Sequence, residues 1–123
     1  MAARWVCDRR GNAAIEVALT LPPLLLMILG VIEFGRALWL QNALDFSVAE
    51  AARCASVNTT QCGTAEAIAA FASARTGSGF DSSMFSAATA SCGHSVSASY
   101  PMALAIPFAP ISVTLTAQAC FPS

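Results

Sequence analysis

Hydrophobic residues are unbroken along one early stretch of the chain. From Ala13 to Ile32, Glu16 is the only charged residue, and the segment after it is apolar on every face of a helix. Twenty residues of helix rise roughly 30 Å, the thickness of the hydrocarbon core of a bilayer. Pro22 and Pro23 would break a helix in water, but membrane helices tolerate such kinks where neighbouring groups satisfy the freed carbonyls. The pattern predicts a transmembrane helix.

Beyond this stretch the spacing of apolar residues becomes that of an amphipathic helix. They recur at steps of three and four residues, at Ala37, Leu40, Leu44, Val48, Ala51 and Ala55. The opposite face is polar and carries Gln41, Asp45, Glu50 and Arg53. We therefore predict one continuous helix from about Ala13 to about Val57, which ends at Asn58 and the two threonines after it.

A short second helix is predicted from Thr64 to Arg75. Thr64 is its N-cap residue, and the apolar side consists of Ala67, Ile68 and Phe71. The glycines of Gly77-Ser-Gly79 end it. The segment from Ser82 to Thr89 is rich in Ser and Ala and is ambiguous, with a further helical turn as one reading.

The C-terminal part alternates between apolar and small polar residues, which is typical of half-buried strands. Two such stretches run from Ser95 to Tyr100 and from Ile111 to Cys120. The three prolines between Pro101 and Pro110 predict an apolar connecting loop instead of regular pairing. The predicted fold class is α+β: a long transmembrane and amphipathic helix, a short helix and a small antiparallel β-sheet stapled by disulfides.

The composition agrees with a membrane-anchored chain of at most one small domain. It has 123 residues, 56% of them hydrophobic and 11% charged, with a mean hydropathy of +0.63. The net charge of −1 gives no reason to expect a nucleic-acid partner. No Lys, Arg, Asp or Glu follows Asp81. Ser and Thr hydroxyls could supply the missing polarity, but we favour a face that packs on the membrane or on other subunits.

The residues that flank the apolar stretch predict its orientation. Arg4, Arg9 and Arg10 precede it, with Asp8 as the only opposing charge, so the positive-inside rule places the N-terminus in the cytoplasm. The part of the chain after the apolar stretch would then lie on the extracytoplasmic side. A cleaved secretory signal peptide is the rival interpretation, and the length of the stretch disfavours it. No small-x-small cleavage site follows the stretch directly, because Ala37, the nearest candidate, lies close to the charged residues Glu33 and Arg36.

The predicted membrane span separates the five cysteines into two groups. Cys7 precedes it, whereas Cys54, Cys62, Cys92 and Cys120 follow it, an even number suited to an oxidising compartment. Three pairings are possible. The local one joins Cys54 to Cys62 and Cys92 to Cys120, and each bridge would contribute on the order of 3 kcal/mol. A zinc site is disfavoured because no Cys-x-x-Cys pair occurs and His94 is the only histidine.

Glu16 needs an explanation, because a carboxylate at the bilayer centre costs up to roughly 3 kcal/mol. It could simply reach the cytoplasmic headgroups beside Arg9 and Arg10. Alternatively, it could pair with a positive charge from another chain or be recognised by a peptidase. No nucleophile–base pair and no phosphate-binding loop is recognisable, so we expect neither an enzyme nor a cofactor.

The residues around Glu16 resemble a known family. The run Arg9-Arg-Gly-Asn-Ala-Ala-Ile-Glu-Val17, the Pro-containing apolar segment and Gly30-Val-Ile-Glu-Phe-Gly-Arg-Ala-Leu38 closely resemble the start of TadE-like minor pseudopilins. These proteins belong to the tight-adherence (Flp) pilus machinery, a branch of type IV pili. The close resemblance covers about Arg9 to Ala55, and the C-terminal strands fit more loosely.

The resemblance implies a processing step and an assembly contact. A prepilin peptidase of the inner membrane would cut after Gly11, leaving Asn12 as the new N-terminus and Glu16 as the fifth mature residue. Glu16 of one subunit could then pair with the new amine of its neighbour. Val17 departs from the family, which usually has Phe or Tyr there, and we expect this departure to slow processing. The implied division is a leader at 1–11, the helix at 12–57 and an extracytoplasmic domain at 58–123.

Two functions from different classes remain. In the first, the chain is a processed minor pseudopilin in the biogenesis of tight-adherence pili. Its partners would be a prepilin peptidase, other pilins and pseudopilins, the inner-membrane assembly platform and the lipid bilayer. In the second, Gly11 and Glu16 are coincidental, and the chain is an unprocessed membrane-anchored scaffold or binding domain.

Overall fold

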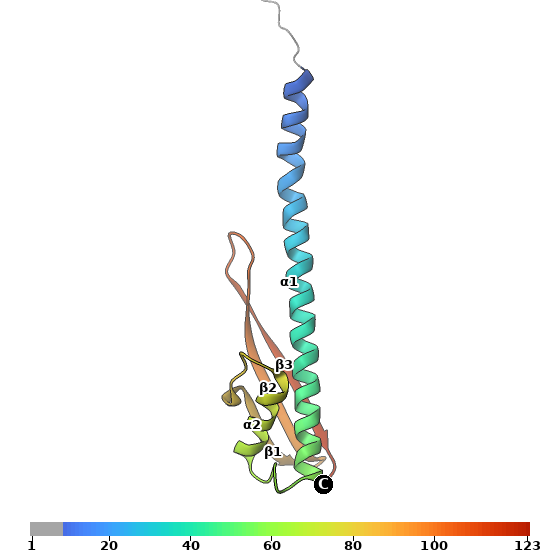
Figure 1. Ribbon diagram of the computed structural model, residues 1–123, viewed down its shortest axis with the longest axis vertical. Helices are drawn as coiled ribbons and strands as arrows, with labels where there is room; N and C mark the ends of the chain where they lie inside the picture. Colours follow the sequence, from blue (N-terminus) through green and yellow to red (C-terminus); the bar gives the residue numbers. More distant parts are fainter. Residues whose placement is uncertain (1–8) are drawn as a thin grey trace, which may run out of the picture.

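The computed structural model describes residues 9–123, with side chains from Gly11 onward. The predictions that concern Arg4, Cys7 and Asp8 lie outside the described residues, as do the side chains of Arg9 and Arg10. Figure 1 shows one long helix, α1, whose C-terminal half is covered by a small layer of helix and sheet.

Helix α1 runs from Arg9 to Val57 without a break. Its 49 residues give it a length of roughly 74 Å. The helix continues through Pro22 and Pro23, as predicted, and ends where predicted. It begins four residues earlier than the sequence pattern indicated, so Gly11 lies in its first turn.

The two halves of α1 have different surroundings. Every residue from 11 to 32 is exposed, and the most apolar 18-residue window of the helix has a mean hydropathy of 2.3 and no buried residue. Within residues 9–123, α1 is the one helix long and apolar enough to cross a membrane. In the C-terminal half, Leu40, Leu44, Val48, Ala51 and Ala55 are buried, which confirms the predicted stripe.

The short helix α2 spans Ala65–Thr76. Thr64 caps it as predicted, because its hydroxyl accepts a hydrogen bond of 3.2 Å from the Ala67 amide. The predicted apolar side of α2 is rotated by about one residue from the observed buried side. Ala67 and Phe71, which were predicted to be on it, are half-buried, and the buried residues are Ile68, Ala69, Ala72 and Thr76. The half-buried Phe71 ring instead lies under the Arg75 guanidinium, 5.0 Å from its carbon to the ring centre.

A three-residue 3₁₀ turn, Ser82–Met84, follows α2 and provides the helical turn that the sequence left open. Asp81 caps it, with its carboxylate 2.8 Å from the Ser83 amide. Hydrogen bonds from the Ser83 amide and hydroxyl lower the pKa of Asp81 below its ordinary value. This cap fixes the chain direction just before the sheet begins.

The sheet has three antiparallel strands in the order β1-β2-β3: Phe85–Ala90, Gly93–Leu104 and Ile111–Phe121. Strand β3 was predicted well. Strand β1 was left ambiguous, because its run of Ser, Ala and Thr lacks the alternation of large apolar residues. The loop prediction for Pro101–Pro110 was wrong in part: β2 continues to Leu104, with Pro101 opposite Thr114.

Strand β2 tolerates Pro101 because of where β1 starts. The β1 pairing with β2 begins at Phe85 opposite Ala98, so from Ser99 onward β2 has a neighbour only on the β3 side. The missing N–H of a proline is acceptable where one side of a strand is unpaired. The outer parts of β2 and β3 therefore form a two-stranded hairpin that extends along α1 beyond the rest of the domain (Figure 1).

The core lies between α1, α2 and the sheet. Helix α1 packs against β2, β3 and α2, and α2 also covers β1. Leu44, Ala51 and Val96 are fully buried there. Two disulfides close the domain in the local pairing, Cys54–Cys62 and Cys92–Cys120.

Candidate processing site and helix–hairpin contacts

The residues that the family resemblance singles out lie together in the first turns of α1. Gly11, Asn12, Glu16 and Val17 are all exposed. A side chain added at Gly11 would meet no atom within 4 Å. Among the described residues, the Glu16 carboxylate makes no ion pair or hydrogen bond, and only its main-chain carbonyl is contacted, by the Thr20 hydroxyl at 2.9 Å.

Helical geometry relates the expected cleavage point to Glu16. Asn12 and Glu16 are four residues apart, so they lie on the same face of α1 about one turn from each other. The first turn of a helix has amide groups without intrahelical partners and opens easily. A protease that needs an extended backbone could therefore unwind this first turn and reach the Gly11–Asn12 peptide bond without disturbing the packed half of α1.

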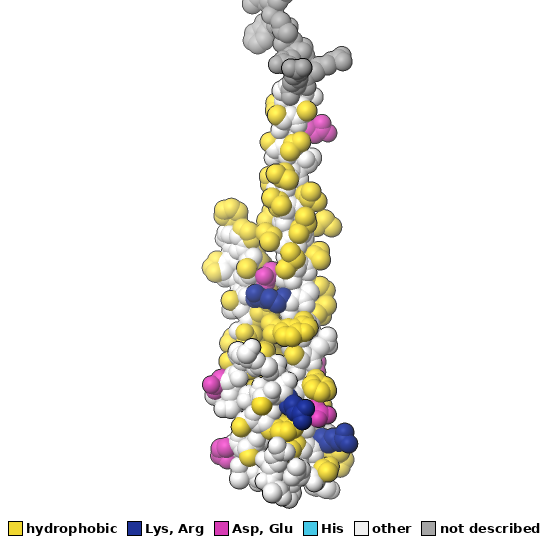
Figure 2. Space-filling model, viewed as in Figure 1, with side chains coloured by type: hydrophobic (Ala, Val, Ile, Leu, Met, Phe, Trp, Pro, Cys, Tyr) yellow, Lys and Arg dark blue, Asp and Glu magenta, His cyan; other side chains and the backbone are white. Residues whose placement is uncertain are grey.

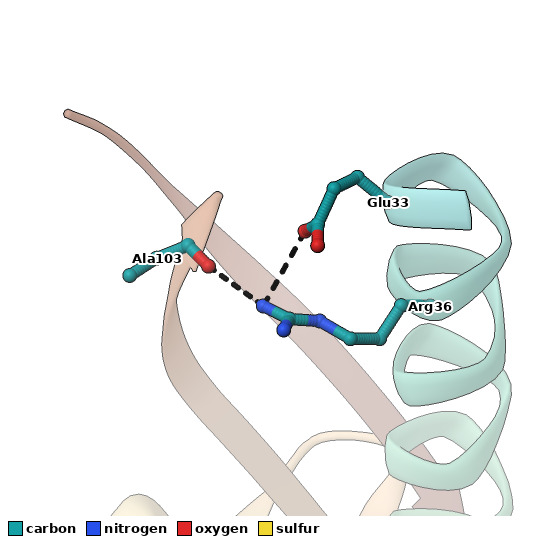
Figure 3. A network of polar contacts seen from close by, with 3 residues as sticks. All are labelled: Glu33, Arg36 and Ala103. Carbon is teal, nitrogen blue, oxygen red and sulfur yellow. Dashed lines mark hydrogen bonds and ion pairs between the residues drawn. The ribbon is translucent and has the colours of Figure 1, made fainter. Parts of the chain in front are cut away.

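Just beyond its exposed apolar half, α1 carries the ion pair Glu33–Arg36, and Arg36 also binds the hairpin (Figure 3). Arg36 Nη2 donates a 2.7 Å hydrogen bond to the main-chain carbonyl of Ala103 on β2, and lies 3.5 Å from Glu33 Oε2. The Glu33 side chain is only 15% exposed, against 47% for Arg36. Glu33 Oε2 is buried and has no hydrogen-bond partner, so its contact with Arg36 is an ion pair without hydrogen-bond geometry.

A second polar contact joins α1 to the same hairpin about one and a half turns further along. Gln41 Nε2 donates to the carbonyl of Thr116 on β3 at 2.9 Å and to Asp45 Oδ1 at 3.2 Å. Arg36 and Gln41 thus hold one carbonyl on each strand of the hairpin. Together they fix the hairpin along the helix at the point where α1 leaves its exposed apolar half.

Sequence reasoning missed this arrangement. It treated Glu33 and Arg36 as residues that disfavour signal cleavage and as part of the family resemblance, and placed Gln41 on a polar face. The available signal was a pair of opposite charges at i,i+3 directly after a long apolar stretch. That signal indicates an ion pair but does not identify Ala103, because the partner is 67 residues away.

The comparisons with known proteins agree with the resemblance over the same part of the chain. Residues 11–53 match the family model described as TadE-like protein. The match begins at Gly11, includes Glu16 and ends within the packed half of α1, so the predicted family resemblance is confirmed for this segment. The match to a TadE-like segment suggests a role for the chain in tight-adherence pilus systems. No curated protein and no solved structure matches the chain.

Proposed function

Because the chain carries a TadE-like segment at residues 11–53, we propose that it is a minor pseudopilin that acts in the assembly of tight-adherence pili. It is made as a single-pass inner-membrane precursor, with the leader in the cytoplasm and the disulfide-bonded domain outside. Its role is structural and not catalytic. The observation that carries the proposal is the family match, which starts at the expected scissile Gly11.

Three features of the fold support membrane insertion in this orientation. Residues 11–32 are exposed and apolar, which suits lipid and not water. Arginines precede this segment, as the positive-inside rule requires of a cytoplasmic end. Both disulfides lie in the domain beyond it, which fits an oxidising compartment.

A prepilin peptidase then cuts after Gly11 and exposes the α-amine of Asn12. The Glu16 carboxylate makes no ion pair or hydrogen bond with the described residues, which suits a contact with a neighbouring subunit. In a packed bundle of α1 helices, the Glu16 carboxylate of one subunit pairs with the Asn12 amine of the next. This pairing offsets the cost of holding a carboxylate in an apolar environment.

The test of processing is co-expression with a prepilin peptidase, followed by intact-mass measurement. Wild type should lose residues 1–11, and Gly11→Val should remain full-length because a β-branched side chain obstructs a narrow cleft. Gly35→Val is the matched control, since Gly35 also lies in α1 with no atom near its missing side chain. A full-length product from every variant would refute processing and favour the unprocessed scaffold.

Glu16→Gln separates peptidase recognition from assembly. If the variant is cut but no longer joins to neighbours, Glu16 acts in assembly; if it stays full-length, Glu16 acts in recognition. Joining is measured with a carbodiimide, which links a carboxylate to an amine at contact distance. Wild-type subunits should give a cross-linked peptide between Glu16 and the Asn12 amine of another subunit.

A further inference from the structure

The outer end of the β2–β3 hairpin lies beside the segment of α1 that is predicted to cross the membrane. Residues 104–110, which we call the hairpin tip, continue past the Arg36–Ala103 contact toward the N-terminal half of α1 (Figure 1). A groove of about 470 Å³ separates the tip from the helix. Its walls include Leu26, Leu29 and Gly30 on α1 and Ala105, Ile106 and Pro107 on the tip.

The rise per residue of the helix gives the depth of the groove in the membrane. The predicted span ends at Ile32. On α1, the groove residues Leu26, Leu29 and Gly30 lie two to six positions before Ile32, and the other groove residues, Glu33, Phe34 and Ala37, lie one to five positions after it. At about 1.5 Å per residue, the groove runs from roughly 9 Å inside the hydrocarbon boundary to roughly 8 Å outside it. The tip continues from the Arg36–Ala103 contact toward the N-terminal end of the groove, so its outer end reaches the boundary of the hydrocarbon region when α1 spans the membrane.

The chemistry of the tip suits lipid. It contains no charged residue, and Ile106 and Phe108 are exposed by 41% and 103%. On the strand that leaves the tip, Ile111 and Val113 are also exposed, by 46% and 43%. Figure 2 shows hydrophobic side chains over both the upper part of α1 and the adjacent end of the hairpin, whereas most of the charged side chains lie lower on the domain.

Part of the hydrogen-bonding requirement of the tip backbone is met within the tip, which matters because hydrocarbon cannot hydrogen-bond unpaired donors. Pro107 and Pro110 have no N–H. The Ile106 amide donates to the Leu104 carbonyl at 2.9 Å, and the Ala109 amide donates to the Ile106 carbonyl at 3.4 Å. A turn closed in this way is less costly to bring into the outer leaflet than an open loop.

Phe108 has an unusual conformation for its type. It is the only described residue other than glycine with a positive φ, at 73°. It follows Pro107 in the turn, at a position where positive φ ordinarily favours glycine. A bulky aromatic side chain that is strained and fully exposed points to a role for the ring itself.

We propose that the hairpin tip is a second membrane-contacting element, which inserts Ile106 and Phe108 into the outer leaflet beside α1. Lipid acyl chains fill the apolar part of the groove between the tip and the helix, which is lined by Leu26, Leu29 and Ile106. This inference rests on the proposed membrane span of α1. It adds to that proposal an anchor that fixes the height and rotation of the extracytoplasmic domain on the membrane.

The test uses tryptophan reporters in the full chain, reconstituted into phosphatidylcholine vesicles at high lipid-to-protein ratio. Trp5 and Trp39 are first replaced by Phe, and Phe108→Trp then introduces one reporter at an exposed position. Phe46→Trp is the matched control: Phe46 is also an exposed aromatic, 57% accessible, but lies roughly 21 Å beyond Ile32 along α1.

Nitroxide-labelled lipids measure the depth of each reporter. Phe108→Trp should show blue-shifted emission and lose most of its fluorescence when the nitroxide lies near the headgroup end of the acyl chain. Phe46→Trp should emit as in water and keep its fluorescence. Water-like, unquenched emission from Phe108→Trp would overturn the proposal. So would a blue shift that depends on protein concentration and resists lipid quenching, because a second copy of the chain would then cover the tip.

A third reporter distinguishes failure of this inference from failure of the proposed span. Leu25→Trp lies within the exposed apolar half of α1, at 50% exposure. Quenching of Leu25→Trp without quenching of Phe108→Trp would leave the membrane span standing and reject tip insertion. Absence of quenching in both would reject the span itself, and tip insertion with it.

Discussion

The Cys92–Cys120 disulfide closes the longer of the two loops and should carry a large share of the stability of the small domain. It joins residues 28 positions apart: Cys92 lies in the turn between β1 and β2, and Cys120 lies on β3 opposite Ser95. Loop-closure entropy for this separation corresponds to about 3.6 kcal/mol at room temperature. The same relation gives about 2.5 kcal/mol for Cys54–Cys62, which are 8 residues apart.

The longer bridge is also the cleaner one to remove. Cys92 is exposed and Cys120 is half-buried, so serine at both positions leaves little cavity and no buried hydroxyl. Cys62, by contrast, is 2% exposed and belongs to the core, so its replacement would add a packing cost to the loop term. We therefore expect Cys92→Ser/Cys120→Ser to lower the free energy of unfolding by about 3.6 kcal/mol.

The assay has to report on the domain and not on the membrane helix. Native-state hydrogen exchange of β2 peptides in mild detergent does so, because the slowest amides exchange through unfolding of the whole domain. Cys7→Ser is the control, since it removes a cysteine outside both bridges. A loss below about 1 kcal/mol would refute the loop-closure reasoning and would show that β2 and β3 stay paired in the unfolded chain.

Three further outcomes follow from the packing. Leu44 is fully buried, so Leu44→Ala should cost about 3 kcal/mol in the same exchange assay, and a cost below about 1 kcal/mol would contradict its place in the core. Gly93 has φ 118° and its missing Cβ would collide with the Phe121 carbonyl, so Gly93→Ala should destabilise the domain by at least about 1–3 kcal/mol. Asp81 has a lowered pKa in the folded state, so it stabilises the domain above the unfolded-state pKa near 3.9, and this contribution is lost as the pH falls further. Carboxyl NMR titration should give Asp81 a pKa below that of a free aspartate. Ser83→Ala should raise this pKa only part of the way back, because the hydrogen bond from the amide of residue 83 remains.

The sequence determined the features that depend on neighbouring residues. An unbroken apolar run followed by a stripe at three- and four-residue steps was enough to predict α1 with its C-terminal end at Val57. Thr64 predicted the start of α2, because an N-cap hydroxyl acts within one turn. The alternation from Ile111 to Cys120 predicted β3 for the same reason, since side-chain period is a local property.

Only the tertiary structure decided what depends on contacts between distant residues. Strand β1 has too few large apolar residues to be recognised locally, and its pairing with β2 makes it a strand. Pro101 reads as a strand breaker until the structure shows that β1 does not reach that part of β2. Arg36 finds the Ala103 carbonyl 67 residues away. That contact aligns the hairpin with α1, and the strands that continue past it place the hairpin tip beside the apolar half of α1. The position of the hairpin along the helix is set by packing, and the periodicity of the sequence does not determine it.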